Sequence, residues 1–372
     1  MGLLAAATRC RGCMPVTTIQ DVARQAGVSV STVSNVLNAR IDRMRPQTRA
    51  RVEAAIEALA FHPSRLARQL KTGQTSLLGL LVPSLVNPLY AHIAREIEAR
   101  AQDKFDHRLM IGSTYRNAAK EEDFFNDLLA HGVRRVIIVS SLAQESHMHS
   151  AVEKGMAVMS YDRRAVPGEV SRIGHVSPDN FESARLAAGH LIEMGHRRLA
   201  FATVAGLTLS RGDKIAGFMA AADAAGLRAS ARILDGGPLD EFGDSVIAEV
   251  GRAIGLKLAA MARRPTGVVA LNDLMAFGLL AGLREGGLEV PADVSVVGID
   301  GTFLATLAHP GLTTIQLPLR EMARALVDEV MKAGADSGVA PFEQVFKEIR
   351  LIRRASVAPP AATSRRGRSV IR

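Results

Sequence analysis

Apolar residues near the start of the chain recur at the spacing of a short helix that is followed by a tight turn. One face of this helix collects Ile19, Val22, Ala23 and Ala26. Thr18 occupies the N-cap position, and Asp21, three residues later, places a carboxylate in the first turn, close to a capping box. Gly27 tolerates the backbone of a tight turn, so the pattern predicts a second helix directly after it.

The second helix is expected to begin after Ser29 and to have an apolar inner face and a largely polar outer face. The inner face consists of Val33, Val36 and Leu37, and the outer face consists of Val30, Ser31, Ser34 and Asn35. A small outer surface with hydroxyl and amide groups is what the major groove of DNA accepts. The two helices therefore indicate a helix-turn-helix, and an ordinary helical hairpin inside a helical core is the alternative.

Two further helical segments follow this motif. Pro46 suits the first turn of a third helix over 46–60, whose apolar face holds Val52, Ala55, Ile56 and Leu59. Residues 63–73 predict a short helix with too few apolar residues to fold alone. We therefore expect a three-helix DNA-binding domain over 14–62 and a hinge helix with its linker over 63–75.

From residue 76 onwards, short apolar runs alternate with helical patterns. The predicted strands are 77–83, 109–113, 133–141, 157–161, 172–176, 199–203, 266–271 and 294–300. The predicted helices are 89–103, 118–131, 180–194, 214–225, 244–262, 274–285 and 319–332. This alternation indicates an α/β core over 76–358 with two doubly wound parallel sheets, one built mainly from 76–176 and the other mainly from 177–305. Ligands of such folds bind at the carboxyl ends of the strands, here between the two halves.

Charge is distributed unevenly along the 372 residues. The net charge of +9 is made up of +2 from residues 1–13, +5 from residues 14–75, −2 from the body over 76–358 and +4 from residues 359–372. A basic head on a slightly acidic body is typical of a protein that binds nucleic acid through one domain.

The hydropathy and the cysteines argue against a membrane protein and against a complete zinc site. The chain has no run of 18 apolar residues, so no membrane segment is expected. Its cysteines are Cys10 and Cys13 alone, which make at most half a zinc site and fit a reducing cytoplasm. Residues 1–13 are expected to be a disordered extension, with Met14 as a plausible start, and 359–372 a disordered basic tail.

An enzyme and a solute-binding protein are the two alternatives to a DNA-binding protein. The chain contains no phosphate-binding loop, nucleophile elbow or zinc-protease motif, so it is not expected to be an enzyme. His147 and His149 are interpreted as surface residues of a loop, without a carboxylate partner. A solute-binding protein without DNA function is the remaining alternative, which the core alone would allow but the basic head disfavours.

Taken in order, the motifs identify a resemblance that extends from about Met14 to Ala358. In the head they are Ile19-x-Asp21-Val22-Ala23-x-x-Ala26-Gly27-Val28-Ser29-x-x-Thr32-Val33-Ser34, Thr48-Arg49-x-x-Val52 and Pro63-Ser64-x-x-Ala67-Arg68-x-Leu70. In the core they include Asp179-Asn180, Gly195-His196-Arg197-Arg198, Asn272-Asp273-x-Met275-Ala276 and Val290-Pro291-x-Asp293-Val294-Ser295. The chain resembles transcriptional repressors of the LacI/GalR type.

This resemblance implies a bacterial, cytoplasmic, nucleoid-associated homodimer whose two heads read a pseudo-palindromic operator in double-stranded DNA. Positions that match base-reading residues are Val30, Ser31 and Asn35, and positions that bind phosphate or support the helix are Thr18, Thr32, Ser34 and Asn38. Arg45 replaces the usual cap of the third helix and is expected to touch phosphate. Leu70 matches a leucine that wedges into the minor groove, with Ala67 and Lys71 beside it. No leucine heptad follows the core, so a helix-bundle tetramer is not expected.

The resemblance also implies a small effector, a sugar or sugar acid, bound between the two halves of a core that is similar to periplasmic sugar-binding proteins. It implies no cofactor and no metal. The matching positions are Asn87, Leu89, Tyr90, Ser140, Ser141, Asp162, Arg163, Asp179, Arg211, Lys214, Asn272, Asp273 and Asp300. Of these, Asp273 is the strongest candidate. Lys214 stands where the family has an arginine, for which Arg211 is a substitute, and an aromatic residue near 236 is missing, for which Phe242 is a substitute.

Overall fold

The computed structural model describes residues 17–37, 40–41, 44–61, 75–140, 142, 144–165, 172–205, 208–237, 244–333 and 339–361. Tertiary contacts divide the chain into two compact units between Thr75 and Ser76. The predicted extension over 1–13, the hinge helix over 63–73 and most of the tail lie outside the described residues. So do the predicted site residues Asn38, Ala67, Leu70, Lys71 and Ser141, and the candidate Phe242.

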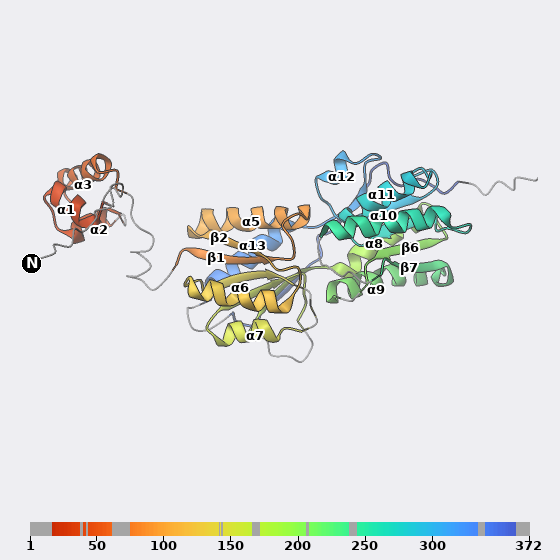
Figure 1. The fold of residues 1–372 in the computed structure, drawn as a ribbon, viewed down its shortest axis with the longest axis horizontal. Coiled ribbons are helices and arrows are strands. Elements are labelled where there is room, and N and C mark those ends of the chain that lie inside the picture. The colour runs from red at the N-terminus through yellow and green to blue at the C-terminus, as the bar shows by residue number, and fades with distance from the viewer. Residues whose placement is uncertain are drawn as a thin grey trace, which may run out of the picture. The chain divides into compact units, whose positions relative to one another are not determined.

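The first unit contains the three predicted helices, α1 (Ile19–Ala26), α2 (Val30–Leu37) and α3 (Pro46–Ala58) (Figure 1). Their apolar faces meet in a small core that includes Val22, Val33, Val52 and Phe61. The turn between α1 and α2 uses Gly27 at a φ of 63°, a backbone conformation that glycine adopts without strain. The helix-turn-helix architecture predicted from the sequence is confirmed.

The second unit begins with a parallel sheet that we call the first subdomain, together with the helices on its faces. From edge to edge the strands are β2 (Arg108–Ser113), β1 (Leu77–Val82), β3 (Arg135–Val139), β4 (Ala157–Tyr161), β5 (Gly174–Pro178) and β11 (Glu343–Phe346). The helices α5 (Pro88–Phe105) and α13 (Leu319–Lys332) pack together on one face, and α6 (Ala118–Ala130) and α7 (Ser146–Glu153) pack together on the other (Figure 1).

The second subdomain repeats this plan. Its strands run in the order β7 (Ala231–Asp235), β6 (Leu199–Thr203), β8 (Gly267–Ala270), β9 (Ser295–Asp300), β10 (Thr313–Gln316) and β12 (Arg350–Ile352), with β12 antiparallel to β10. Its helices pack as the pairs α8 (Asn180–Glu193) with α9 (Leu209–Ala224) and α10 (Asp244–Ala260) with α11 (Asp273–Glu285). The short elements η1 (Arg228–Ser230) and α12 (Leu304–Leu307) complete it.

The chain passes between the two subdomains after β5, after β10 and after β11. The predicted division at residue 176 therefore holds for the first crossing only, because α13 and β11 return to the first sheet. The pattern of apolar runs did not predict β7, β10, β11 and β12. β7 and β11 are edge strands with exposed residues, and β10 and β12 are short, so none of them presents a long apolar run.

The interpretation of His147 and His149 as surface residues of a loop was wrong about the loop, and wrong about exposure for His147 but not for His149, whose side chain is 43% exposed. Both lie on α7, and His147 is buried, with its Nε2 2.6 Å from Oε2 of the buried Glu121 on α6. Phe125 stacks on the same imidazole. His149 Nε2 lies 3.7 Å from Glu145 Oε2. Glu121 was missed because it is distant in sequence and reaches His147 only through the packing of α6 on α7, whereas Glu145 is four residues before His149 and was a signal in the sequence.

Candidate DNA-binding surface and effector cleft

The outer face of α2 presents the predicted base-reading residues to solvent. Val30 is 42% exposed, and Ser31 and Asn35 are exposed beside it, whereas Val33 on the opposite face is fully buried. Ser29 Oγ accepts a hydrogen bond from the Thr32 backbone N–H at 3.2 Å and lies 2.9 Å from Thr32 Oγ1. The helix therefore offers a small apolar group, a hydroxyl and an amide along one exposed edge.

Thr18 and Arg45 lie at the starts of the other two helices of the head. Thr18 donates from Oγ1 to Asp21 Oδ2 at 2.6 Å and accepts from the Asp21 backbone N–H, which completes the predicted capping box. The hydrogen bonds that the Thr18 hydroxyl and the Thr18 backbone N–H donate to the Asp21 carboxylate lower the pKa of Asp21. Arg45 occupies the N-cap position of α3 without a side-chain cap hydrogen bond and is exposed, so its guanidinium is placed at a helix N-terminus facing solvent.

A narrow cleft separates the carboxyl ends of the strands of the two subdomains. Its lining consists of Leu89, Tyr90, Arg116, Tyr161, Asp162, Asn180, Thr208, Ser210, Arg211, Lys214, Ile247, Leu271, Asn272, Asp300 and Leu317. The free volume is about 50 Å³, well below the 300 Å³ or more of typical ligand pockets. The cleft in this structure is therefore smaller than a sugar-sized molecule.

The first subdomain lines the cleft through the start of α5 and the loop after β2. Asn87 caps α5 by accepting from the Leu89 backbone N–H at 3.0 Å, which places Leu89 and Tyr90 at the cleft. Arg116, at a φ of 53°, donates to the Tyr90 hydroxyl, and its guanidinium also lies 5.8 Å from the centre of the Tyr90 ring. A cation is thereby fixed at the first wall of the cleft.

The second subdomain lines the cleft through α9 and the start of α11. Arg211 and Lys214 are both buried on the first turns of α9, and Arg211 donates to the Ala205 carbonyl oxygen at 3.1 Å. Burial, followed by repulsion from the Arg116 guanidinium, lowers the pKa of Arg211 to about 10. Asn272 caps α11 by accepting from the Met275 backbone N–H at 2.9 Å. Cations from both subdomains thus face the same small space.

Two aspartates at the cleft have unusual backbone conformations. Asp162 directly follows β4 at a φ of 67°, and Asp300 ends β9 at a φ of 134°. The Asn180 side-chain amide donates to Asp162 Oδ1 at 2.9 Å. Backbone conformations that disfavour residues with a Cβ cluster at functional sites, where the surrounding structure maintains them.

Several predicted effector residues lie outside the cleft lining. Asn87 and Asp179 cap helices, and Ser140 is buried behind the lining, where its carbonyl oxygen accepts from Ser160 Oγ. Arg163 is buried in the first subdomain, where it pairs with the buried Glu145 and donates to the Leu142 carbonyl oxygen. Its long side chain reaches an internal carboxylate, which the position after β4 did not reveal.

Asp273, the strongest candidate from the sequence, is fully buried beneath the cleft. It accepts hydrogen bonds from the Thr302 backbone N–H at 2.8 Å, from Thr302 Oγ1 at 2.9 Å and from Thr314 Oγ1. Burial raises the pKa of Asp273 to about 6, against these donors and the nearby Arg354. The carboxylate therefore ties the start of α11 to β10 and the segment after β9, and it does not face the cleft.

Sequence reasoning also missed cleft residues. These are Arg116, Tyr161, Asn180, Thr208, Ser210, Ile247, Leu271 and Leu317. Asn180 was quoted in a motif but not chosen. The others follow or end a strand or lie near the start of a helix, and the position of Arg116, just after β2, was the available signal.

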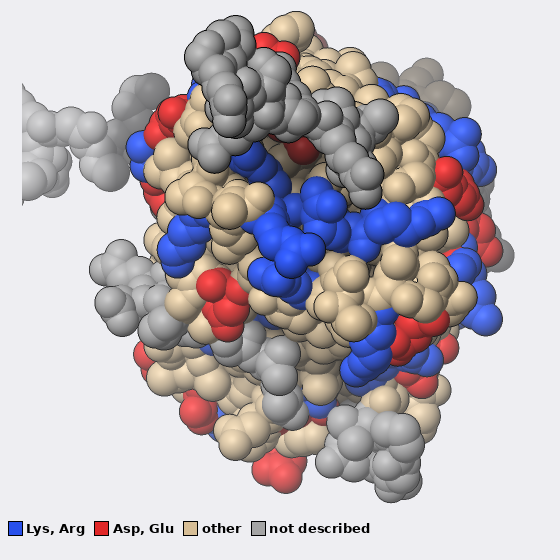
Figure 2. Space-filling model, turned by 90° about the vertical axis from the view of Figure 1, so that its right-hand side faces the viewer, with Lys and Arg blue, Asp and Glu red and all other residues tan. Residues whose placement is uncertain are grey.

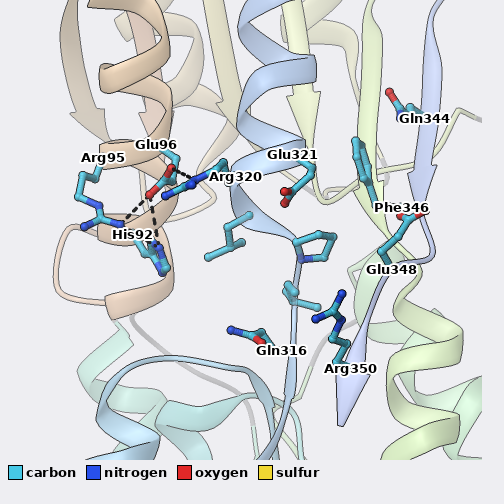
Figure 3. A pocket seen from close by; sticks show the side chains of 13 residues that line it. His92, Arg95, Glu96, Gln316, Arg320, Glu321, Gln344, Phe346, Glu348 and Arg350 are labelled. Atoms are coloured by element: carbon cyan, nitrogen blue, oxygen red, sulfur yellow. Dashed lines mark hydrogen bonds and ion pairs between the residues drawn. The ribbon is translucent and has the colours of Figure 1, made fainter. Parts of the chain in front are cut away.

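A larger cavity of about 640 Å³ lies beside the crossings between the subdomains (Figure 3). The first subdomain contributes α5, the start of α13 and β11, and the second contributes Gln316 and Arg350. Glu96 accepts from Arg95, its neighbour on α5, at 2.6 Å and from Arg320 Nε at 3.3 Å, and the second of these ion pairs joins α5 to α13. Two arginines on this wall thus share the Glu96 carboxylate.

The described residues contain no cluster of three or more His, Cys, Asp or Glu side chains that could hold a metal ion. None of the helices within the described ranges is long and apolar enough to cross a lipid bilayer.

Comparisons with known proteins agree with both units. Residues 18–64 match the family model for bacterial regulatory proteins of the lacI family, and residues 188–357 match the model for a periplasmic binding protein-like domain. The HTH-type transcriptional regulator GalR of Escherichia coli (strain K12) is 30% identical over 346 residues, covering 93% of this chain and 97% of GalR.

Solved structures extend the likeness to both units together. A lac repressor dimer bound to operator and the anti-inducer ONPF superposes with a TM-score of 0.77 at 26% identity, covering 92% of this chain and 99% of that one. A complex of the transcriptional regulator CelR with cellobiose gives 0.63 at 27% identity, covering 91% and 99%. The chain therefore belongs to the lacI family of bacterial regulatory proteins and is a DNA-binding transcriptional regulator.

Proposed function

We propose that this regulator binds a pseudo-palindromic operator as a homodimer and that a sugar or sugar acid in the cleft sets its affinity for that operator. The observation that carries the proposal is the cleft itself, which is lined from both subdomains and is too small for a ligand unless they separate. A ligand that favours one separation over another shifts the population of the form that binds DNA. Couplings of this kind amount to about 1–3 kcal/mol, enough for a switch.

The DNA side of the proposal rests on the exposed edge of α2. Asn35 can pair bidentately with adenine, Ser31 can bond to either base type, and Val30 can contact a thymine methyl group. Thr18, Thr32, Ser34, Asn38 and Arg45 are assigned to phosphate contacts or to support of the helix, which fix register. The operator in the lac repressor dimer structure supports the same arrangement here. Leu70, with Ala67 and Lys71, is proposed to widen the minor groove between the two half-sites.

The effector side rests on the mixture of groups in the cleft. Carboxylates and amides such as Asp162, Asp300 and Asn272 suit the hydroxyl groups of a sugar, and the cellobiose of the CelR complex supports this class of ligand. Arg116, Arg211 and Lys214 add the cations that a sugar acid would need. Tyr90 and Tyr161 supply the aromatic surface that is absent near residue 236.

Because its partner is chromosomal DNA, we infer that the protein works in the bacterial cytoplasm at the nucleoid. We also infer that it has no catalytic activity. A solute-binding protein without DNA function is disfavoured by the helix-turn-helix at the start of the chain.

The test combines a ligand screen with a DNA-binding measurement on the full chain. A thermal-shift panel of neutral sugars and sugar acids should contain a ligand that raises the melting temperature, since ligands that bind only the folded state stabilise it. That ligand should change operator affinity, with an operator selected from a random DNA pool. Arg211→Gln should lose the response and keep operator binding, whereas Arg185→Gln, on the surface of α8, should keep both. Operator affinity that no ligand of the panel changes would contradict the proposal.

A further inference from the structure

A cluster of arginines lies on the second subdomain at the end opposite the cleft. Arg197 and Arg198 directly precede β6, and Arg263 and Arg264 precede β8. The carboxyl ends of these parallel strands face the cleft, so the residues before them lie at the far edge of the sheet. Figure 2 shows Lys and Arg side chains gathered on this face. We call these four residues the arginine cluster.

Hydrogen bonds join the two loops of the arginine cluster into one rigid surface. Arg198 Nε donates to the Arg264 carbonyl oxygen at 2.9 Å, and the Thr266 backbone N–H donates to the Arg198 carbonyl oxygen at 2.9 Å. The buried His196 ring lies 3.0 Å from both Thr266 Oγ1 and the Ala358 carbonyl oxygen. The guanidinium groups are therefore presented from a pre-organised base, which reduces the entropy lost on binding.

The arginine cluster differs from other surface arginines in its partners. Elsewhere Arg185 pairs with Glu182 at 2.5 Å, and Arg252 with Glu285 at 2.7 Å. Among the described residues, no carboxylate lies within ion-pair distance of any member of the cluster. Arg197, Arg198 and Arg264 donate to backbone carbonyl oxygens instead, which leaves their positive charge uncompensated. A concentrated positive charge of this kind attracts a polyanion.

The chain itself adds to this charge in sequence. Its last described residues pass the cluster, because Ala358 bonds to His196 and Pro360 lies beside Gly195. The following residues, 362–372, include Arg365, Arg366, Arg368 and Arg372. These four arginines lie outside the described residues and are not part of the arginine cluster.

We propose that the arginine cluster binds the phosphate backbone of a second DNA duplex, separate from the one that the helix-turn-helix reads. Guanidinium groups match phosphate oxygens in pairs, and DNA is a polyanion that this protein already meets. The contact reads no sequence, since nothing in the cluster resembles a base-reading element. A regulator with such a surface brings two segments of DNA together through a single molecule.

The test is a bridging measurement with the full chain. One random-sequence duplex of about 40 base pairs is fixed to beads, and a second, fluorescent duplex is captured through the protein at 50 and 150 mM salt. The cluster variant Arg197→Gln/Arg263→Gln should bind the second duplex about thirtyfold more weakly at 150 mM salt, because the two lost phosphate contacts together remove close to two units from the salt slope. Arg197→Lys/Arg263→Lys, which keeps the charge, should retain most of the capture.

The matched control is Arg185→Gln/Arg252→Gln, which loses the same charge from paired arginines on α8 and α10. It should bridge like the unaltered protein. Equal capture by the cluster and control variants would overturn the proposal, since the two heads of a dimer would then account for all bridging. Polyglutamate that displaces the fluorescent duplex as well as unlabelled duplex does would also overturn it, in favour of an acidic protein partner. Melting temperatures of all variants establish that the fold is kept.

Discussion

Two helix pairs occupy equivalent places in the two subdomains and are held together by different means. The pair α6 and α7 follows β2 and β3, and the pair α10 and α11 follows β7 and β8, at the same positions in the strand order. In the first pair, Glu121 and His147 form a buried hydrogen bond across the interface. In the second, Gly251, Gly255, Gly278 and Gly282 let the two backbones approach closely.

The difference shows that the same arrangement of helices can be stabilised either by a buried polar pair or by close backbone contact, and that different substitutions disrupt the two. A buried carboxylate–imidazole pair depends on each polar group keeping its partner, and it is costly to break. A glycine-mediated contact depends on shape alone and is sensitive to any added atom. The first subdomain also buries Arg163 with Glu145, and burial, followed by repulsion from Arg163, lowers the pKa of the nearby His175, so the pattern extends beyond one pair.

The largest expected effect comes from breaking the polar pair. His147→Leu should lower the free energy of unfolding by about 3–5 kcal/mol, because it leaves the fully buried Glu121 with only the long hydrogen bond from Thr114 Oγ1. Chemical denaturation of the full chain, followed by circular dichroism, measures the change. Glu121→Gln/His147→Leu should recover much of the loss, because a neutral amide costs less to bury. A double variant as unstable as the single one would show that packing, and not charge, holds α6 to α7.

The next largest effect concerns the glycine-mediated pair. A Cβ at Gly278 would overlap the carbonyl oxygen of Ala248, so Gly278→Ala should destabilise the protein by about 1–3 kcal/mol as α10 and α11 are forced apart. Gly189, on α8, has open space around its Cβ position. Gly189→Ala should therefore stabilise the protein by about 0.5–1 kcal/mol. Thermal unfolding of both variants separates close approach from helix propensity, and an equal response would remove the distinction.

These two helix pairs also show which elements could be predicted from the sequence and which could not. The helices 118–131, 244–262 and 274–285 were predicted within two residues of their observed ends, because apolar periodicity dominates them. The helix α7 was missed because its buried face includes His147 and its partner lies on another helix. Polar residues whose burial depends on a distant partner carry no local signal of that burial.

The predicted cleft residues also fall into two groups, those that line the cleft and those that are buried away from it. Tyr90, Asp162, Arg211, Lys214, Asn272 and Asp300 lie on its lining as expected from the resemblance. Arg163 and Asp273 follow strands in the same manner, yet each is withdrawn into its own subdomain by partners that only the folded chain provides. Position after a strand predicts nearness to the cleft, whereas the direction of the side chain depends on tertiary contacts.

A pH titration of the free energy of unfolding should show the buried polar groups of the first subdomain through a change of about 2 kcal/mol. Burial, with repulsion from Arg163 and His149, lowers the pKa of His175 from 6.5 to about 4. The unfolded chain therefore binds this proton more tightly, so the stability is present above pH 6.5 and is lost as pH falls toward 4. Between pH 7 and pH 5 the free energy of unfolding should decrease by about 2 kcal/mol through this residue.

The matched variant for this titration is His175→Gln, which removes the titrating group from β5. Its stability should depend less on pH between 7 and 5 than that of the unaltered protein, with a smaller slope remaining from His190 and His196, whose pKa values are also lowered by burial. Identical pH profiles would mean that His175 does not contribute.

The smallest effect concerns the two cleft aspartates, which end equivalent strands, β4 and β9, in different conformations. Asp300 has a φ of 134°, where only glycine is unstrained, so Asp300→Gly should raise the free energy of unfolding by about 1 kcal/mol. Asp162 has a φ of 67°, which aspartate tolerates, and it accepts a hydrogen bond from Asn180, so Asp162→Gly should change stability little. Both variants should weaken the proposed effector response, because both remove a carboxylate from the cleft. If only Asp300→Gly gains stability while both variants lose the response, the second subdomain maintains backbone strain at Asp300 for ligand binding. Equal stability changes at the two positions would argue against any such strain.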